Sequence, residues 1–530
     1  MDLLSPLPLV AFALVLASLW LFNQWRSRTQ SHQTKFRSPP EPPGAWPLIG
    51  HLRLLRGTGQ TPLARTLGAM ADKYGPIFLF RLGVHPVVVV SNWESFKECF
   101  TANDIALASR PQSGASKYLG YNMAGFGFAP YGPFWRDMRK LVAIELLSAH
   151  RLELFKRVRI SEIHISIKQL YRTSKNNEAF AMNPWLEQLT LNIITRMVSG
   201  KRYFDRTGGE QDPGAGNFRR VIKEFMYLSG VFVLSDVIPF PPLMWVDLIL
   251  GGKLRKVKRV MGELDGIVGS WIEEHVGERK GGGKEEDEEE EDFIDVMLGG
   301  IDEGGSFGHT RETIIKATVL NLILAGSDTT SINLTWLLSI LLNNPPALTR
   351  AREEIDAQVG KTRWVEESDI KGLFYLQAIV KETLRLYPPG PLAVPHQATE
   401  DCEIAGYSIP KGTRLFPNVW KLHRDPRVWP DPEKFVPERW LPGNHAAGMD
   451  VSGKNFEFCP FGSGRRSCPG TAFAMQVTQL TLARLVQGFE IATPGNEPVD
   501  MGEGLGITLP KVRPLEVVIT PRLASDLYEG

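Results

Sequence analysis

The segment Phe461-Gly-Ser-Gly-Arg-Arg-Ser-Cys-Pro-Gly470 constrains the fold more than any other part of the chain. Its glycines at 462, 464 and 470 permit positive φ and let the backbone approach a flat ligand closely. Cys468 stands just before an expected helix that opens with Pro469. Helix-terminal N–H groups stabilise negative charge on sulfur and lower the pKa of a thiol, so the segment predicts a metal-binding thiolate. Taken alone, a cysteine such as Cys468 is more often a buried structural thiol.

The chain is large enough to bury a bulky ligand. It has 530 residues and no long interdomain linker beyond its amino-terminal segment, which predicts a single globular domain. Sixty basic and 59 acidic residues give a net charge of +1, so there is no electrostatic footprint for nucleic acid. The four cysteines, Cys99, Cys402, Cys459 and Cys468, form no C-x-x-C pair. Their spacing argues against a disulfide framework or a structural zinc site and favours a reducing, cytosol-facing location, with Cys459 as a structural thiol.

An apolar run without charged side chains extends from Leu3 to Phe22. About 20 such residues suffice to cross a bilayer, so we expect a transmembrane anchor at residues 1–23. A cleaved signal peptide is the alternative, but Asp2 replaces the usual positive leader and no clear small-x-small site follows. The basic residues after the run, with no acidic residue among them, predict that the body of the protein faces the cytoplasm.

Two segments are expected to lie outside the folded body. Residues 24–47 are basic and then proline-rich, and Ser38-Pro-Pro-Glu-Pro-Pro-Gly-Ala-Trp-Pro47 predicts a stiff spacer because proline lacks an N–H donor. Residues 280–292 form a glycine hinge and an acidic block that is too self-repelling to fold compactly, which predicts a disordered loop. The catalytic domain is expected over residues 48–530.

Hydrophobic periodicity predicts a mainly α protein with a smaller β-rich region. Ile77–Val84 and Pro86–Val90 are β-branched and aromatic runs around a turn, which predicts a hairpin. Helical periodicity then dominates to about residue 390. A second β-rich patch is expected around Ile404 to Phe416, followed by a proline-rich loop region and a helix after Cys468.

Polar residues interrupt a long apolar helix that is expected from about Thr313 to Asn344, where Pro345-Pro346 ends it. Gly326 costs a helix interior about 1 kcal/mol, and Asp328 and Thr329 need polar partners in an apolar stripe. Such local conflicts tend to mark functional sites. The alternative is that Asp328 caps a second helix.

Charged side chains recur in two later segments. Glu382 and Arg385 are three residues apart on an expected helix, where they share a face and can pair. Pro437-Glu-Arg439-Trp follows. Each pattern alone is weak, because helical surfaces carry many ordinary ion pairs of this spacing.

These segments together resemble the cytochromes P450. The pattern F-x-x-G-x-R-x-C-x-G is similar to their haem-binding signature, and it is matched at every fixed position from Phe461 to Gly470. The resemblance extends from Pro39 onward. Segments such as Tyr121-Asn-Met-Ala-Gly-Phe-Gly-Phe and Leu386-Tyr-Pro-Pro-Gly-Pro-Leu look like plant microsomal members, in particular the family numbered eighty-two, which oxidises alkaloids, flavonoids, coumarins and terpenoids.

The resemblance implies roles for residues around a haem b whose iron is axially ligated by the Cys468 thiolate. Glu382, Arg385 and Arg439 would form a buried charge triad; the family usually has phenylalanine where this chain has Trp440, a departure expected to leave the charge pattern untouched. The hydroxyl of Thr329 and the neighbouring acid Asp328 would deliver protons to dioxygen on the distal side. Residues implied in haem binding are Phe461, Gly462, Arg466, Trp135, Arg139 and His396, the last four near the propionates; a lone histidine after proline is otherwise often a turn residue.

The substrate pocket can be placed only by analogy. We expect it to be lined by Met123, Phe126, Leu322, Ala325, Leu392, Val394 and Leu505. These side chains are apolar, so they suit a flat or compact lipophilic molecule held by shape. Plain core packing is the alternative for each of them.

The implied function is an NADPH- and O2-dependent monooxygenase that hydroxylates a lipophilic plant metabolite. Its expected partners are NADPH-cytochrome P450 reductase, membrane lipid, O2 and the small-molecule substrate, and its expected location is the endoplasmic reticulum membrane. Lys140 and Arg465 flank haem-facing motifs and are candidates for reductase docking, although such charges are more often simply solvated. Two alternatives stay open: a haem-thiolate isomerase or dehydratase that works without O2, and a non-catalytic haem-binding membrane protein.

Overall fold

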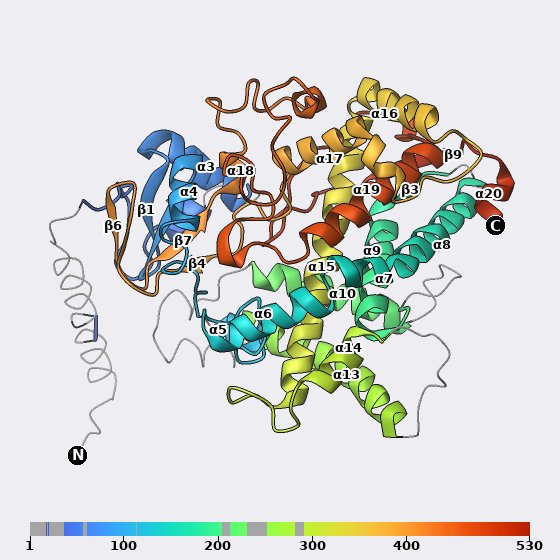
Figure 1. Ribbon diagram of the computed structural model, residues 1–530. Coiled ribbons are helices and arrows are strands. Elements are labelled where there is room, and N and C mark those ends of the chain that lie inside the picture. Colours follow the sequence, from blue (N-terminus) through green and yellow to red (C-terminus); the bar gives the residue numbers. More distant parts are fainter. Residues whose placement is uncertain are drawn as a thin grey trace, which may run out of the picture.

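A computed structural model describes residues 17, 18, 20, 37–56, 61–112, 114–176, 178–203, 213–230, 252–280 and 291–530. In Figure 1 the long helices gather on one side and the main sheet with its short helices on the other. The expected anchor, Leu3–Phe22, lies almost wholly outside the described residues, as do residues 281–290 of the acidic block. Among the described helices, none combines the length and the apolar character that a membrane crossing needs.

Helices make up most of the described chain. The longer ones are α3 (Leu63–Tyr74), α4 (Trp93–Phe100), α6 (Pro133–Glu145), α8 (Lys156–Ser174), α9 (Met182–Ser199), α10 (Pro213–Ser229), α13 (Lys253–Lys280), α14 (Phe293–Gly300), α15 (Arg311–Leu342), α16 (Pro345–Gln358), α17 (Phe374–Leu386) and α19 (Thr471–Gly488). The short ones are α2 (Leu52–Arg56), α5 (Gly114–Leu119), α7 (Ala149–Leu154), α18 (Val419–Leu422) and α20 (Ser525–Glu529). The predicted mainly α architecture with a smaller sheet region is confirmed.

Helix α15 runs through the middle of the molecule, where α9, α13, α17 and α19 pack on it (Figure 1). It begins after Thr310, whose side chain accepts a hydrogen bond from Thr313 N, and it ends before Pro345-Pro346. The helix is unbroken through Asp328, so the alternative in which Asp328 caps a second helix is wrong. A Cβ at Gly326 would lie 3.2 Å from Ile194 Cγ1, so glycine here lets α9 approach α15 closely.

The main sheet contains the predicted hairpin. Strands β1 (Ile77–Leu82) and β2 (His85–Val90) pair antiparallel with Ile77 opposite Val90, and the sheet order is β1-β2-β7-β4. The second β-rich patch forms three strands, so this prediction is also confirmed. The remaining strands are β3 (Phe180–Ala181), β4 (His396–Gln397), β5 (Cys402–Ile404), β6 (Tyr407–Ile409), β7 (Arg414–Pro417), β8 (Phe489–Ala492) and β9 (Glu516–Pro521).

The proline-rich segment packs against this sheet. Leu79 N donates to Pro40 O at 2.8 Å, and His51 Nε2 lies 2.8 Å from Pro42 O. Arg81 forms an ion pair with Glu41 at 2.7 Å. From residue 37 onward the segment is therefore attached to the body, although it was expected to act as a spacer.

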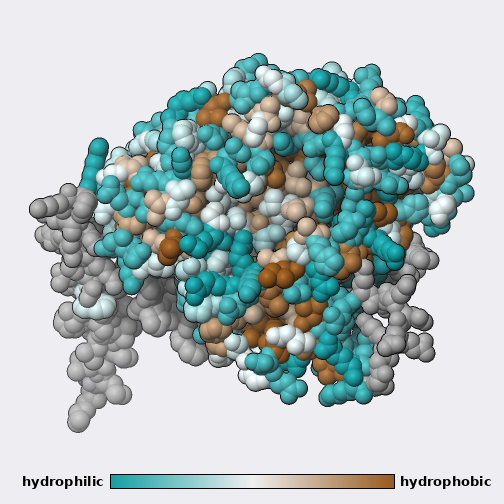
Figure 2. Space-filling model, in the orientation of Figure 1, coloured by the Kyte–Doolittle hydropathy of each residue, from teal (hydrophilic) through white to brown (hydrophobic). Residues whose placement is uncertain are grey.

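The buried apolar side chains form one large cluster among the helices and two smaller clusters beside the main sheet. The face seen in Figure 2 is largely hydrophilic, with hydrophobic patches between. The helical cluster includes side chains from α9, α15, α17 and α19, so the segments that carry the sequence motifs meet in one core.

Candidate functional site

The segment around Cys468 forms a tight loop before α19. Cys468 N donates to Phe461 O at 2.9 Å, which closes the loop on itself. Gly462 and Gly464 have positive φ, +72° and +66°, as expected for a backbone that L side chains rarely adopt. Gly470, at φ −89°, does not, and α19 begins only at Thr471. Pro469 therefore precedes the helix, because Gly470 takes the capping position.

The Cys468 side chain is exposed. Burial raises the pKa of the thiol, while the backbone N–H of Gly470, the charge of Arg139 and the Thr471 hydroxyl lower it. The donors thus act in the predicted sense, against the larger effect of desolvation. A bound metal ion is what deprotonates a coordinating thiol outright.

Three guanidinium groups gather beside this loop. Arg466 donates to Ala108 O, Phe126 O and Ala129 O and stacks 4.2 Å above the Trp135 ring. Arg139 lies 5.7 Å from the same ring and donates to Ser467 O at 2.7 Å, so the predicted pairing of Trp135 and Arg139 on one face of α6 is present. Arg110 donates to Val394 O and Pro395 O.

No carboxylate of the described residues forms an ion pair with Arg110, Arg139 or Arg466. Burial and the charge of Arg139 lower the pKa of Arg110 to about 9. Burial, then the charges of Arg110 and Arg139, lower the pKa of Arg466 to about 8. A guanidinium does not give up its proton in proteins, so these three neighbouring cations, of which Arg110 is buried and the other two are partly buried, require an anion. The two propionates of a haem whose iron lies at Cys468 fit this requirement.

His396 lies next to this cluster but differs from its expected character. The side chain is buried, and Nδ1 lies 2.8 Å from Leu107 O, which only accepts hydrogen bonds. Burial and the charge of Arg110 hold the pKa of His396 well below its usual value. A neutral ring with its proton on Nδ1 has only a lone pair at Nε2, so it cannot donate to a carboxylate there. The positive charge at this position therefore comes from Arg110.

The charge triad is assembled as predicted, with one addition. Arg385 Nη2 and Nε donate to the two oxygens of Glu382 at 2.8 and 2.9 Å, and Arg439 Nε donates to Oε1 at 3.1 Å. Trp440 Nε1 donates to Glu382 Oε2 at 2.9 Å. The charge pattern is intact, as expected, and the neutral Trp440 indole completes the set of donors around the carboxylate.

The triad is linked to the Cys468 loop through His423. Arg385 Nη1 donates to His423 O at 2.9 Å, and His423 Nε2 accepts from Cys459 N at 3.0 Å. Burial, then the charge of Arg385, lowers the pKa of His423 to about 3, so this ring is neutral and can accept. Cys459 O accepts from Gly462 N at 3.0 Å. His423 and Cys459 thus have the structural roles expected of them.

Asp328 and Thr329 lie near the middle of α15. Thr329 Oγ1 donates to Ala325 O at 2.6 Å, and Asp328 Oδ2 accepts from Thr508 Oγ1 at 3.0 Å. Burial raises the pKa of Asp328 to about 6, although the Thr508 hydroxyl lowers it. A carboxyl with a pKa near the working pH can both take up and release a proton.

A small cavity adjoins Asp328. Its volume is about 20 Å³, enough for one water molecule, and Asp328, Glu187, Lys223 and Thr190 are among its lining residues. Glu187 pairs with Lys223 at 2.8 Å. The carboxyl of Asp328 thus faces a site where water can reach it from the side of α9 and α10.

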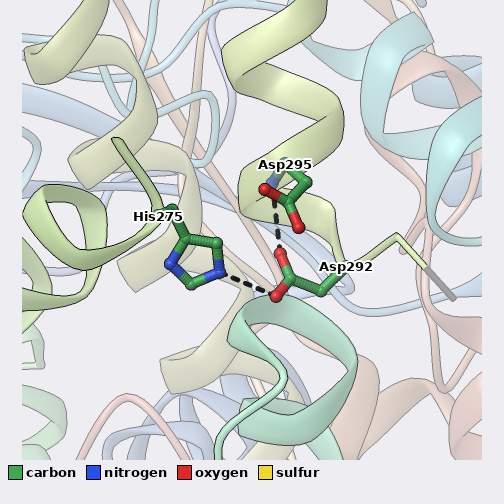
Figure 3. Close-up of side chains that lie close together, drawn as sticks. All are labelled: His275, Asp292 and Asp295. Atoms are coloured by element: carbon green, nitrogen blue, oxygen red, sulfur yellow. Dashed lines mark hydrogen bonds and ion pairs between the residues drawn. The ribbon is translucent and has the colours of Figure 1, made fainter. Parts of the chain in front are cut away.

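A second cluster of potential metal ligands lies away from these residues (Figure 3). The ligand atoms of His275, Asp292 and Asp295 lie within 4.8 Å of one another. His275 Nε2 is 2.8 Å from Asp292 Oδ2, while Nδ1 is 2.7 Å from Trp271 O. Both ring nitrogens face acceptors, so the ring is a doubly protonated cation in an ion pair and offers no lone pair to a metal.

Comparison with known proteins decides the family. The family model described as Cytochrome P450 matches residues 39–515. The chain belongs to the cytochrome P450 family. A zebra fish cytochrome P450 structure with progesterone has a TM-score of 0.73, 25% sequence identity, and coverage of 87% of this chain and 100% of that chain.

Similar plant cytochromes P450 cover nearly the whole chain. The nicotine N-demethylase CYP82E4 of Nicotiana tomentosiformis is 48% identical, over 99% of this chain and all of the relative. The vinorine hydroxylase of Rauvolfia serpentina is 50% identical over the full length of both. The xanthotoxin 5-hydroxylase CYP82C4 of Arabidopsis thaliana is 50% identical over 94% of this chain and 96% of the relative.

Membership fixes the reaction class. This cytochrome P450 is a monooxygenase that carries haem b on a cysteine thiolate and receives electrons from NADPH through a reductase. The predicted resemblance to the family numbered eighty-two is confirmed.

The expected pocket residues of this cytochrome P450 fall into two groups. Phe126 and Leu322 belong to the large hydrophobic cluster, and Leu392 packs against a smaller one. Ala325 is exposed although it lies within α15, and Val394 and Leu505 are 38% and 48% exposed. Met123 has a positive φ of 71°. Their contacts with a substrate stay predictions.

Sequence reasoning missed three residues of this region. Arg110 lies in a segment without a motif. Its hydrogen-bond acceptor, Val394 O, belongs to a residue 284 positions away in the sequence. Trp440 looked like a minor departure from the usual phenylalanine. Asn321 Oδ1 accepts from Gly127 N at 2.8 Å, and nothing in the sequence around Asn321 signalled that contact.

Proposed function

We propose that this cytochrome P450 inserts one oxygen atom of O2 into a C–H bond of a lipophilic plant specialised metabolite. The relatives carry this proposal: their names record two hydroxylations and an N-demethylation. An N-demethylation starts as hydroxylation of the N-methyl carbon, so one reaction type accounts for all three. An alkaloid or a furanocoumarin is accordingly the first substrate class to test.

Cys468 is the proposed axial ligand. Arg110, Arg139, Arg466 and the Trp135 indole would hold the propionates, and Phe461 and Gly462 would lie along the haem face. The unpaired guanidinium cluster supports these roles, because it supplies the positive charge that two carboxylates require. When bound, the haem activates dioxygen with electrons that originate from NADPH.

Asp328 and Thr329 are proposed to move protons on the distal side. The raised pKa of Asp328, about 6, makes its carboxyl able to exchange a proton, and the adjoining cavity has room for the water that resupplies it. The Thr329 hydroxyl would pass the proton onward after leaving Ala325 O. An isomerase that works without O2 has no use for this pair, so its presence favours the monooxygenase.

Residues 1–23 are proposed to anchor the protein in the endoplasmic reticulum membrane, with residues 24–47 as the connecting segment. The charge-free run from Leu3 to Phe22 supports this location. Lys140 is the simpler candidate for reductase docking. Arg465 is already paired with Asp104 at 3.3 Å, so it has less charge to offer a partner.

The ligand assignment is tested by reducing the haem-loaded protein under carbon monoxide. The wild type is expected to give the red-shifted Soret band of a thiolate complex, and Cys468→Ala is expected to lose it. Retention of the band in the variant would sink the assignment. Thr329→Ala should keep the band but consume NADPH without matching product; tight coupling in that variant would refute the proton role.

The substrate class is tested by Soret shifts on adding nicotine, vinorine and xanthotoxin, followed by turnover with NADPH and a plant reductase. A shift with NADPH- and O2-dependent product from at least one of them is expected. Product formed without O2 would instead support the isomerase alternative.

A further inference from the structure

The segment Gly120–Ala129, here called the pocket loop, has an unusual backbone. Tyr121, Asn122 and Met123 are three consecutive non-glycine residues with positive φ, 50°, 53° and 71°. Left-handed backbone is unfavourable for a non-glycine residue, because its Cβ lies too close to the following carbonyl oxygen. Such a run persists only where contacts outside the loop hold it in place.

One anchor is at the start of the pocket loop. Tyr121 Oη donates to Asp265 Oδ1 at 3.0 Å, and Lys316 of α15 pairs with Asp265 at 3.1 Å. This contact joins the loop to α13 and α15 together.

A second anchor is a close steric fit around the amide of Asn321. Gly127 N donates to Asn321 Oδ1 at 2.8 Å. A Cβ at Gly125 would lie 2.8 Å from Asn321 Nδ2, and a Cβ at Gly127 would lie 2.6 Å from Asn321 Oδ1. Only glycine on both sides of Phe126 lets the backbone lie this close to the amide.

A third anchor reaches the Cys468 loop. Arg466 Nη1 and Nη2 donate to the carbonyl oxygens of Phe126 and Ala129, at 3.3 and 2.6 Å. The peptide unit between Phe126 and Gly127 is therefore held from both sides, by Asn321 at its N–H and by Arg466 at its carbonyl. Phe126 itself is 8% exposed within the main core.

We propose that Asn321 is a positioning residue that sets substrate selectivity by fixing the peptide unit after Phe126 and, with it, the Phe126 wall of the pocket. The proposal rests on the proposed function, because it takes Phe126 as part of the substrate pocket. Asn321 acts through the loop and needs no contact with the reacting atoms. Larger ligands that reach Phe126 depend on this amide, and small ligands do not.

The test uses two haem ligands of different size, imidazole and 4-phenylimidazole, whose binding is followed by Soret titration of the haem-loaded protein. For Asn321→Ala we expect about tenfold weaker binding of 4-phenylimidazole and unchanged binding of imidazole. An unchanged ratio of the two dissociation constants, which includes equal weakening of both ligands, would overturn the proposal. Asn333→Ala is the matched control: it lies on the same helix, donates to Thr478 instead, and should leave the ratio unchanged.

A second variant keeps the proposal testable if Asn321→Ala folds poorly. Gly127→Ala adds a methyl that collides with Asn321 Oδ1, so it should also weaken 4-phenylimidazole selectively. In the double variant with Asn321→Ala the added methyl has space, and its further effect should be close to none. Additive effects of the two changes would refute the contact.

The carbon monoxide spectrum separates the two levels of failure. A normal thiolate band with an unchanged ligand ratio in both single variants overturns the role of Asn321 alone. Loss of the thiolate band in the wild type overturns the proposed function itself. With nicotine or xanthotoxin as substrate, a rise in KM or a changed product ratio at nearly constant kcat further supports positioning, and equal losses of coupling and rate oppose it.

Discussion

At the scale of single residues, Glu382 shows how one indole nitrogen adds a donor to a buried charge network. Its carboxylate is fully buried and accepts from two arginines, from Val436 N and from Trp440 Nε1. A hydrogen bond to a buried charged group is worth more than one between neutral groups, because the carboxylate has lost its water. Trp440 therefore belongs to the network that holds the Cys468 loop.

Trp440→Phe is expected to lower the free energy of unfolding by about 1.5–3 kcal/mol beyond the loss of ring volume. Trp429→Phe is the matched control, since Trp429 stacks in the same aromatic group but its buried Nε1 has no hydrogen-bond partner among the described residues. Denaturant titration of both haem-loaded variants measures the difference. Equal losses would show that the indole hydrogen bond contributes nothing.

Asp328 predicts a pH dependence of stability. Its folded pKa of about 6 lies above the ordinary 3.8, so between these values the folded state binds the proton more readily than the unfolded state. The cost of burying the charge is present above about pH 6 and disappears as the pH falls towards 4. Asp328→Asn, which keeps an acceptor for Thr508, should raise the thermal midpoint at pH 7.5 but give no gain at pH 4.5. A constant difference across this range would contradict the assignment.

The residues of this site differ in how far the sequence could predict them. Cys468, Glu382, Arg385 and Arg439 stand in patterns of fixed spacing, so their geometry followed from the sequence. Arg110 and Asn321 have no such pattern, because their partners lie 284 and 194 positions away. The pKa directions of Cys468 and His396 also depend on burial, which spacing does not reveal.

At the scale of elements, α13 and α14 are joined by the ion pair of His275 and Asp292 (Figure 3). Asp292 also caps α14, because its Oδ1 accepts from Asp295 N at 3.1 Å. Arg279 lies nearby, with Nε 3.5 Å from Asp295 Oδ1. The sequence predicted a disordered block over residues 280–292. Its last residue, Asp292, is buried, so the predicted end of the block is wrong.

The pH dependence of this contact has the opposite sign from that of Asp328. Burial lowers the pKa of His275, but the hydrogen bond and charge of Asp292 outweigh it and leave the pKa above its ordinary 6.5. The stabilisation is thus complete below about pH 6.5 and is lost as the pH rises through the folded pKa. Hydrogen exchange of the α14 amides should accelerate beyond the intrinsic rate as the pH rises above about 6.5.

The variants of this pair separate charge from capping. His275→Gln should abolish the extra pH dependence of exchange. Asp292→Asn keeps a good capping residue and loses only the ion pair, whereas Asp292→Ala loses both and should cost about 1 kcal/mol more. If Asn and Ala at 292 behaved alike, the cap would have no energetic role.

The predicted elements were right where a periodic pattern met clear end signals. The hairpin of β1 and β2 has both, and α15 lies within two residues of its predicted ends, of which Pro345-Pro346 marked the second. The start of α19 was predicted too early. Proline is common as the first residue of a helix, but here Pro469 precedes the capping residue Gly470 and the helix begins at Thr471. The packing of α9 on Gly326 could not be predicted, because it depends on a residue from another helix.

At the scale of the whole molecule, the attachment of residues 37–47 predicts how truncation affects stability. Removing residues 1–23 leaves the contacts of Pro40, Glu41 and Pro42 with the body in place, so this shortened protein is the reference. Starting the chain at residue 48 removes the hydrogen bonds of Pro40 O and Pro42 O, at a cost of about 2 kcal/mol in free energy of unfolding. Equal stability of the two shortened proteins would mean that the catalytic domain begins at residue 48.

The cluster of Arg110, Arg139 and Arg466 also has a consequence for the amount of protein in a cell. Three neighbouring cations, one buried and two partly buried, have no carboxylate partner among the described residues and repel each other, so a chain that meets no haem folds against that repulsion. A ligand that binds only the folded state shifts the equilibrium by mass action. The steady-state level of this protein should therefore follow the haem supply of its host, and added haem precursor should raise the yield of soluble protein even for variants that turn over no substrate.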